Sequence, residues 1–558
     1  GLDDSADDLV IGVGSAVGTT PAIHVDENKK VTVGESGVAS TISGIPFFQG
    51  DTGSIYTHDV SGTDDTAQYN TAYGLTALDA VTTGDKNTVM GFDAGGALTT
   101  GSANTIIGEN AGSNGAITGD DNTVVGKIAG YALTSGHSNT LIGRHAASAL
   151  TTGVRNTSLG MGANDSGADD ENDNMAIGYN ALAGASLAGA EYNVAIGNYT
   201  LDAISSGDDN TVVGYAAGGA LTTGTNNVII GKNTAAGQAM VGDHNTFVGA
   251  GAAYNATDCD HNTIIGRDAG YALTNGDDNT IIGEEAGKAL TTGYNNVLIG
   301  NDAGAALTGG ARNCFIGCGA GDGHDAETYN VGIGEAALGG AIAGGEYNTS
   351  VGPLSLDALT TADKNVAMGY GAGGDVTTGY ENVIIGYNAG ITGTGLTQGA
   401  QNILLGPHTR ASHADGGNQI VIGYDIAGGE NDECSIGKNS NVIRVQYDTD
   451  ATWTRDSDER KKKNIKPDVL GLDFVNDLNT VTFNWRPNNE FPKEWDDYSE
   501  ENKMNLDATM HGMIAQEVKA ALDKTGVDTF GGWKQGKDGV QRLSNDMFVF
   551  PLIKAVQE

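Results

Sequence analysis

Several groups of side chains in this 558-residue chain have the types and spacing needed for chemistry. Neighbouring carboxylates occur at Asp169-Asp170-Glu171 and at Asp208-Asp209. A pair of carboxylates can supply the acid and the base or nucleophile of a glycosidase. Neither group differs from the acidic residues in the segments around it, so we interpret both as surface loops.

The cysteines and the glycine-rich segments are the other chemical candidates. Cys314 and Cys318 form a C-x-x-x-C pair, and Cys259 and Cys434 are isolated. No matching Cys or His pair stands at zinc-site spacing, so we interpret all four as packing residues and expect no metal. Fragments of the form G-x-G-x-x-G occur without a β-α-β context, so we expect no nucleotide or other cofactor.

Most of the acidic, cysteine and glycine-rich segments lie within one internal repeat, which determines their secondary structure. The pattern N-x-x-x-G recurs at 20 regularly spaced positions, mostly 17 residues apart and at most 20 apart. It begins at Asn70, Asn87, Asn104, Asn122, Asn139, Asn156, Asn174, Asn193, Asn210, Asn227, Asn245, Asn262, Asn279, Asn296, Asn313, Asn330, Asn348, Asn365, Asn382 and Asn402. A stretched copy follows at Asn418.

Each repeat fits one coil of a parallel β-solenoid. Asn279-Thr-Ile-Ile-Gly283 is a short β-branched run between turn residues, which predicts a strand. Leu290-Thr-Thr-Gly293 is a second apolar step, so we expect two or three short strands per coil. Stacked coils lie about 4.8 Å apart, which lets the Asn side chains form an amide ladder at a corner where Asn and Gly tolerate left-handed angles. Frequent Gly disfavours the alternative, a helical repeat.

The thin coils favour side-by-side packing of several rods. Many positions are Ala or Gly, and we interpret these as outward residues that let another chain approach closely, in a trimer. The phrase N-x-V-x-I-G-x-x-A resembles the head repeats of trimeric autotransporter adhesins, which form left-handed parallel β-rolls. The unit in this chain is longer.

Charge excludes two classes of partner. The net charge is −41, with 14 basic and 18 acidic residues from Ser457 onward and 15 basic and 52 acidic residues before it. Residues 1–456 therefore carry −37, and such an acidic surface would repel nucleic acid and anionic lipid. No run of 18 apolar residues occurs, so we expect no membrane insertion.

Composition divides the chain into four predicted parts. Residues 1–69 are β-rich, with a hairpin over Ile23–Val33 that turns at Asn28-Lys29. Residues 70–423 form the solenoid, and residues 424–456 form a β-rich connector with a strand at Val442–Val445. Residues 457–558, where all Trp residues but Trp453 lie, form a small α+β domain. Its clearest helix is predicted over Met513–Leu522, with Ile514, Val518 and Leu522 on one face, and ends near Gly526.

The last part carries three motifs in order. They are "SDERKKKNI", "GLDFVNDLNTVTFNW" and "HGMIAQEV". Together they resemble the intramolecular chaperone domain of phage tail spikes and fibres, the endosialidase type. Taken alone, the basic run "ERKKKN" is typical of a solvated surface; its two companion motifs favour the family interpretation.

The resemblance implies a chaperone that helps three chains to form a β-rich fibre and then cuts itself off before the motif serine. The bond is Asp456–Ser457, and the Ser-Lys pair is Ser457 and Lys462. Asp458 and His511 are auxiliary candidates. A lysine acts as a base only when neutral, and the cations beside it favour that form. Lys461 stands where the family has an apolar residue. The family continues past "FPLIKAVQE" into a long helical segment that joins three chains, so we expect this segment either to be missing after Glu558 or not to be included in the sequence.

The prediction is therefore a structural virion protein, outside the cell: a homotrimeric phage tail fibre or spike for host attachment. Its enzymatic activity is at most a single self-cleavage by a serine peptidase. Its partners would be other tail or baseplate proteins and a host receptor, either a glycan or an outer-membrane component. The alternatives are a trimeric bacterial surface adhesin and a polysaccharide-degrading tail spike. The end of the chain lacks the amphipathic membrane strands that would anchor such an adhesin.

Overall fold

The structure is a computed structural model. It describes the chain except residues 1, 4–7, 13–20, 26–30, 33–39, 43–44, 50–53, 58–65, 166–170, 185–188, 392–394, 448–449, 456, 494, 496–497, 503–505 and 538; before residue 54 and at 450–455 the description covers the backbone alone. The chain divides into two compact units, Gly1–Arg455 and Asp456–Glu558.

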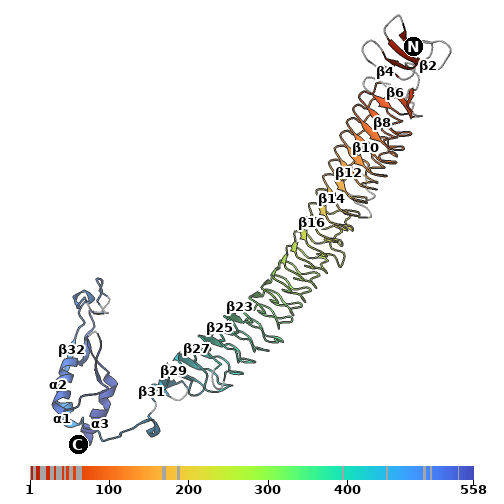
Figure 1. Ribbon diagram of the computed structural model, residues 1–558. Coiled ribbons are helices and arrows are strands. Elements are labelled where there is room, and N and C mark those ends of the chain that lie inside the picture. The colour runs from red at the N-terminus through yellow and green to blue at the C-terminus, as the bar shows by residue number, and fades with distance from the viewer. Residues whose placement is uncertain are drawn as a thin grey trace. The chain divides into compact units, whose positions relative to one another are not determined.

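The first unit is a parallel β-solenoid with one three-residue strand in nearly every coil (Figure 1). Each strand pairs in parallel with the strand of the next coil, as between Thr280–Ile282 and Val297–Ile299. The repeat strands are β8 (Thr71–Tyr73), β9 (Thr88–Met90), β10 (Thr105–Ile107), β11 (Thr123–Val125), β12 (Thr140–Ile142), β13 (Thr157–Leu159), β14 (Met175–Ile177), β15 (Val194–Ile196), β16 (Thr211–Val213), β17 (Val228–Ile230), β18 (Thr246–Val248), β19 (Thr263–Ile265), β20 (Thr280–Ile282), β21 (Val297–Ile299), β22 (Cys314–Ile316), β23 (Val331–Ile333), β24 (Thr349–Val351), β25 (Val366–Met368), β26 (Val383–Ile385) and β27 (Ile403–Leu405).

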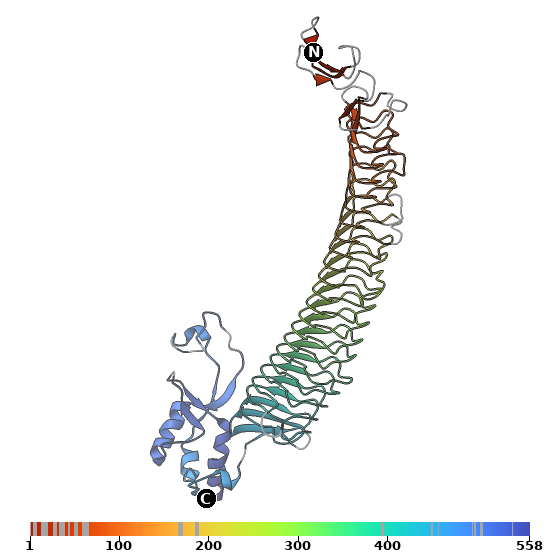
Figure 2. The same cartoon turned by 45° about the vertical axis from the view of Figure 1, so that its right-hand side comes forward.

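The core of each coil is thin. In the coil that starts at Asn279, the central strand residue Ile281 is fully buried together with Ala286 and Leu290. The repeated Ala therefore fills the interior, and its interpretation as an outward residue is wrong. The second apolar step, at Leu290, is also not a strand; among the described residues this column forms only isolated bridges such as Leu98↔Ile117. The strands stack along one side of the rod (Figure 2).

The repeated Asn side chains form the predicted ladder in the interior. The Asn296 backbone N–H donates to Asn279 Oδ1 at 3.0 Å, and Asn296 Nδ2 donates to the same atom at 3.1 Å. Asn279 Nδ2 also donates to the Gly293 carbonyl at 2.9 Å, so the side chain joins two corners of the coil. Left-handed residues stand before the Asn, such as Asp278 at φ +56°, and two positions after the strand-ending Gly, such as Glu285 at φ +57°, which differs from the expected place at the Asn.

The Gly that ends each strand is required by contact with the next coil. Gly283 has φ +141°, and a Cβ built on it would lie 2.2 Å from the Gly300 carbonyl oxygen. Any side chain at this position would therefore push neighbouring coils apart.

At both ends of the Asn ladder a different residue takes the place of the Asn. Ser54 Oγ accepts the Asn70 N–H at 3.0 Å in the first coil, next to β7 (Ile55–Tyr56). At the other end Gln419, and not the expected Asn418, takes the ladder position, since its N–H donates to Asn402 Oδ1 at 3.0 Å.

Antiparallel strands border the parallel ladder. Before it lie β5 (Ser40–Ile42) and β6 (Ile45–Gln49), and β6 pairs with β7. After it, β28 (Ile420–Tyr424) pairs in parallel with β29 (Glu433–Lys438), which is followed by β30 (Asn441–Gln446) and β31 (Asp450–Arg455) in antiparallel order.

A separate four-stranded sheet begins the chain. It contains β1 (Leu2–Asp3), β2 (Asp8–Gly12), β3 (Pro21–Val25) and β4 (Val31–Thr32). The strands β3 and β4 pair in antiparallel order, which confirms the predicted hairpin, while its turn at Asn28-Lys29 lies outside the described residues.

The second unit is small and of the α+β class. Its elements are the 3-10 turns η1 (Glu459–Lys461), η2 (Asn488–Glu490) and η3 (Asn545–Phe548), the helices α1 (Leu472–Asn476), α2 (Ala515–Thr525) and α3 (Val549–Gln557), and the strands β32 (Thr480–Phe483), β33 (Met510–Met513), β34 (Trp533–Gln535) and β35 (Gln541–Leu543). Its core contains Leu470, Phe474, Val518, Ala521 and Leu522.

The predicted helix over Met513–Leu522 is α2, which starts two residues later and ends at Gly526 in the left-handed conformation (φ 73°). Val518 and Leu522 are buried as expected, but Ile514 stands at the N-cap and is 39% exposed.

Candidate active site

A single turn brings Ser457 and Lys462 together at the start of the second unit. The turn η1 fills the space between them, and Lys462 follows it in an extended conformation (φ −112°, ψ 149°). As a result Lys462 Nζ lies 2.6 Å from Ser457 Oγ, within hydrogen-bonding distance. Both side chains are exposed in the single chain.

Asp458 shapes this turn. Its Oδ1 accepts the Arg460 backbone N–H at 2.8 Å, which caps η1, and its carboxylate pairs with the Arg460 guanidinium at 2.7 Å. The hydrogen bond from Arg460 holds the pKa of Asp458 below its ordinary value. Asp458 is thus an ionised cap that sets the turn, and its described contacts are to Arg460 and not to Ser457.

His511 lies elsewhere in the unit. It stands on β33 opposite Thr482 of β32 and lines an open hollow with Met513 and Asn545. Among the described residues, no hydrogen bond joins His511 to Ser457 or to Lys462. The structure therefore brings Ser457 and Lys462 into contact, places Asp458 in the turn between them, and leaves His511 apart. Asp456, on the other side of the expected cleavage bond, lies outside the described residues.

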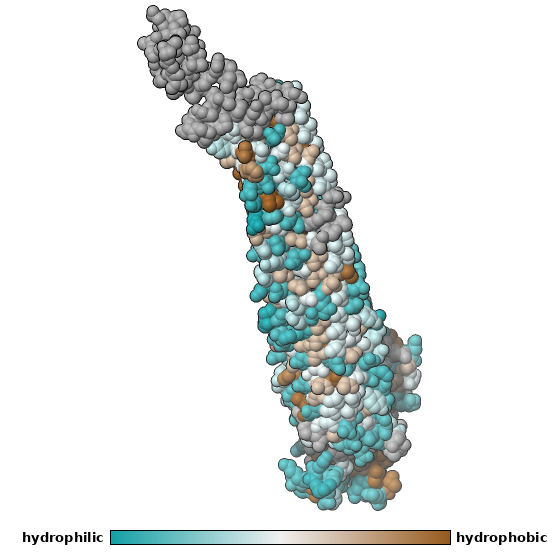
Figure 3. Space-filling model, turned by 90° about the vertical axis from the view of Figure 1, so that its right-hand side faces the viewer, coloured by the Kyte–Doolittle hydropathy of each residue, from teal (hydrophilic) through white to brown (hydrophobic). Residues whose placement is uncertain are grey.

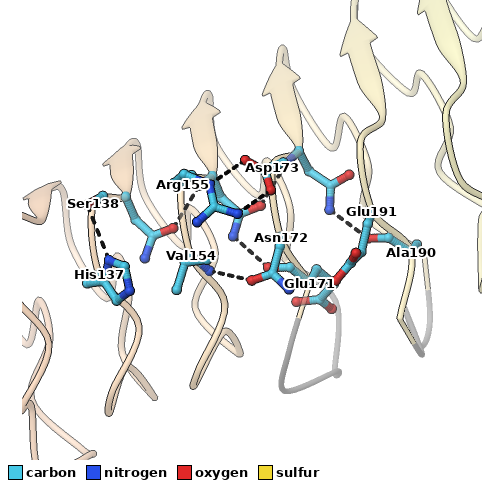
Figure 4. Close-up of polar contacts among 12 residues, drawn as sticks. His137, Ser138, Val154, Arg155, Glu171, Asn172, Asp173, Ala190 and Glu191 are labelled. Carbon is cyan, nitrogen blue, oxygen red and sulfur yellow. Dashed lines mark hydrogen bonds and ion pairs between the residues drawn. The ribbon is translucent and has the colours of Figure 1, made fainter.

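The acidic groups of the rod have a structural role that sequence reasoning missed. The residue two before each ladder Asn often accepts a backbone N–H from the preceding coil. Asp208 Oδ1, for example, accepts the Glu191 N–H at 2.8 Å. In Figure 4 the same geometry joins Asn172 Oδ1 to the Val154 N–H at 2.9 Å.

These side chains form a second hydrogen-bonded ladder, two residues before the Asn ladder. The sequence indicated it by the recurrence of Asp, Asn or Ser two residues before the ladder Asn, as at Asp85, Asp120 and Asp277. Of the other candidate carboxylates, Asp169 and Asp170 lie outside the described residues and Glu171 is buried.

The cysteines occupy three kinds of position. Cys259 and Cys434 are buried, as expected of packing residues, and burial raises the pKa of Cys259 to about 12. Cys314 is half-buried in β22. Cys318 is exposed, so the interpretation of Cys318 as a packing residue is wrong.

Comparison with known proteins gives one match. Residues 457–527 match the family described as chaperone of endosialidase. The matched segment starts at Ser457 and ends just after α2, so it contains the Ser457–Lys462 contact. No curated protein and no solved structure shows significant similarity to the chain.

The described residues lack two further features. Within them, no helix combines the length and apolar character needed to cross a membrane. The same part of the chain has no cluster of three or more His, Cys, Asp or Glu side chains arranged to hold a metal ion.

Proposed function

We propose that the chain is a homotrimeric phage tail-fibre or tail-spike protein. In this proposal the solenoid of residues 70–423 is the shaft and residues 424–456 connect it to the chaperone, residues 457–558. The observation that carries the proposal is the 2.6 Å contact between Lys462 Nζ and Ser457 Oγ, at the first residue of the chaperone match. Host attachment, through a glycan or an outer-membrane component, is the task of the assembled rod.

Self-cleavage follows from the same contact. Neutral Lys462 takes the proton from Ser457 Oγ, and the oxygen attacks the carbonyl carbon of Asp456. The C–N bond breaks, the Ser457 nitrogen takes up the proton, and an ester joins the two residues. Water then hydrolyses this ester, which gives the Asp456 carboxylate and restores the Ser457 hydroxyl. The overall reaction consumes one water per peptide bond.

Three variants test the cleavage. The full chain should be cut after synthesis, and sequencing of the small fragment should start at Ser457. Ser457→Ala and Lys462→Ala should remain at full length on a denaturing gel. Lys461→Ala is the matched control and should be cut as the wild type is. Cleavage of Ser457→Ala at the same bond would show that Ser457 is not the nucleophile.

Assembly is tested separately. Light scattering on the assembled protein should give about three times the 56.8 kDa chain mass, or three times the mass of the cleaved shaft. A wild-type monomer in dilute buffer would contradict the proposed fibre. Shortened glycan after incubation with host capsule or lipopolysaccharide would instead favour a polysaccharide-degrading spike.

A further inference from the structure

One side of the rod is lined by the outward side chains of the strands. The strand face comprises the first and third residues of β8 to β27, which point away from the core on both sides of a buried central residue. Because each strand is in register with the next, these residues form two straight columns along the rod.

The strand face is apolar or neutral throughout. Its third-residue column is Ile, Val, Leu or Met in every one of these strands except β8, which has Tyr73. Its first-residue column is Thr, Val, Met, Ile or Cys. Neither column has a charged residue in these described strands. Large side chains remain open to solvent in the single chain, with Met90 50% and Met368 49% exposed.

The two borders of the strand face are electrically balanced. One border is the residue before each ladder Asn, and the other is the residue after each strand-ending Gly. Eight of the ten basic residues between Asn70 and Gln419 lie there: Lys86, Arg155, Arg312, Lys364, Lys127, Arg144, Lys232 and Arg267. The borders also hold eight acidic residues, Asp121, Asp173, Asp209, Asp278, Glu381, Glu109, Glu284 and Glu335.

Border charges pair along the rod. Lys127 bonds Glu109 at 3.0 Å, and Arg155 bonds Asp173 at 2.5 Å, each one coil apart. The net charge of −37 in residues 1–456 therefore lies away from the strand face and its borders. The side of the rod in Figure 3 has hydrophilic residues along its length and few strongly hydrophobic ones.

We propose that the strand face is the surface on which the rods of the trimer pack against one another, in parallel. This inference rests on the proposed trimeric fibre and names the contact surface within it. Rods of like charge repel wherever their acidic sides meet, so only an uncharged side permits contact along the whole length.

The occupant is a further copy of the chain because the partner must match the face in both length and repeat. Twenty strands at about 4.8 Å form a strip about 95 Å long, and two columns with their side chains are about 10 Å wide. The strip therefore offers about 950 Å² per copy, comparable with the roughly 800 Å² per partner of a stable interface. A parallel copy places Ile and Val columns against identical columns over the full strip.

Charge placed on the strand face tests the proposal. The double variant Ile282→Asp/Ile299→Asp puts two carboxylates on adjacent outward positions. The matched control Thr83→Asp/Thr100→Asp adds the same charge in adjacent coils at exposed positions outside the strands, where Asp258 stands in another coil. By light scattering after cleavage or removal of the second unit, the strand-face variant should lose at least tenfold in trimer stability. The control should stay trimeric, and circular dichroism should show folded rods in both.

A chemical test leaves the face unchanged. Cys314 is the first residue of β22 and so lies on the strand face, whereas Cys318 lies on a border. In the Cys318→Ser protein, a short bismaleimide should link Cys314 thiols of different copies, and Cys314→Ser should abolish these linked chains. Absent links, or a trimer that tolerates the two Asp residues, would overturn the strand-face assignment while leaving the trimer intact. A monomeric wild type would overturn the fibre proposal itself.

Discussion

Replacement of His324 by Leu tests the burial pattern of the core. His324 occupies the column that Leu307 fills one coil earlier and Ile342 one coil later. Its side chain has no exposed surface, and the Phe315 ring lies 4.7 Å away between centroids. Neither ring nitrogen has a hydrogen-bond partner among the described residues. Burial lowers the pKa of His324 to about 3, so the imidazole is neutral in the folded rod.

The magnitude follows from proton linkage. In the unfolded chain the imidazole takes up a proton below about pH 6.5, whereas the folded rod takes it up only near pH 3. Stability is therefore lost as the pH falls between these values, by about 1.4 kcal/mol per pH unit. At pH 5 the loss is about 2 kcal/mol relative to pH 8. His324→Leu removes this loss, and it also removes two unpaired buried nitrogens, a gain of about 1–3 kcal/mol at any pH.

Thermal melting of the uncleaved protein at pH 8 and at pH 5 provides the assay. His324→Leu should melt higher than the wild type at pH 8, and its advantage should grow by about 2 kcal/mol at pH 5. Ile342→Leu is the control in the same column, and its effect should not depend on pH. If the advantage of His324→Leu is the same at both pH values, the histidine is not held neutral and the assigned burial is incorrect.

Two further substitutions test the repeat itself, each by its thermal or urea midpoint. Asn279→Ala leaves the Asn296 N–H and the Gly293 carbonyl unpaired inside the rod and should cost about 2–6 kcal/mol; an unchanged midpoint would show that the ladder contributes no stability. Gly283→Ala should cost several kcal/mol because its Cβ would meet a carbonyl oxygen at 2.2 Å. Gly309→Ala, where the nearest atom lies at 3.7 Å, should be neutral, and equal effects of the two glycine variants would refute the close contact between coils.

The sequence was sufficient for the solenoid because its determinants recur at a fixed period. The ladder Asn and the strand-ending Gly face their own counterparts in the next coil, so a spacing of 17 residues identifies both the coil and its direction of stacking. A single coil holds few residues, however. A small side chain such as Ala fits both in the core and on the surface, so the residue type alone does not predict its burial. For that reason the buried Ala286 was expected on the surface.

Other features depend on geometry that spacing does not fix. Gln419 takes the final ladder position because strand β28 is in register with β27 one residue later than the N-x-x-x-G pattern implies. The contact between Ser457 and Lys462 spans five residues, a separation at which neither a helix nor a strand places two side chains together. The 3-10 turn capped by Asp458 brings them together, and only the family resemblance pointed to the pair.

Because antiparallel strands flank the parallel sheet at both ends, the number of 17-residue coils between them determines the length of the rod. At one end β6 pairs with β7, and at the other β29 pairs with β30, so neither end of the parallel sheet is left to recruit another rod. Every coil between them offers the same upper and lower surface. Gain or loss of one 17-residue unit would change the length of the rod by about 4.8 Å and leave both ends unchanged.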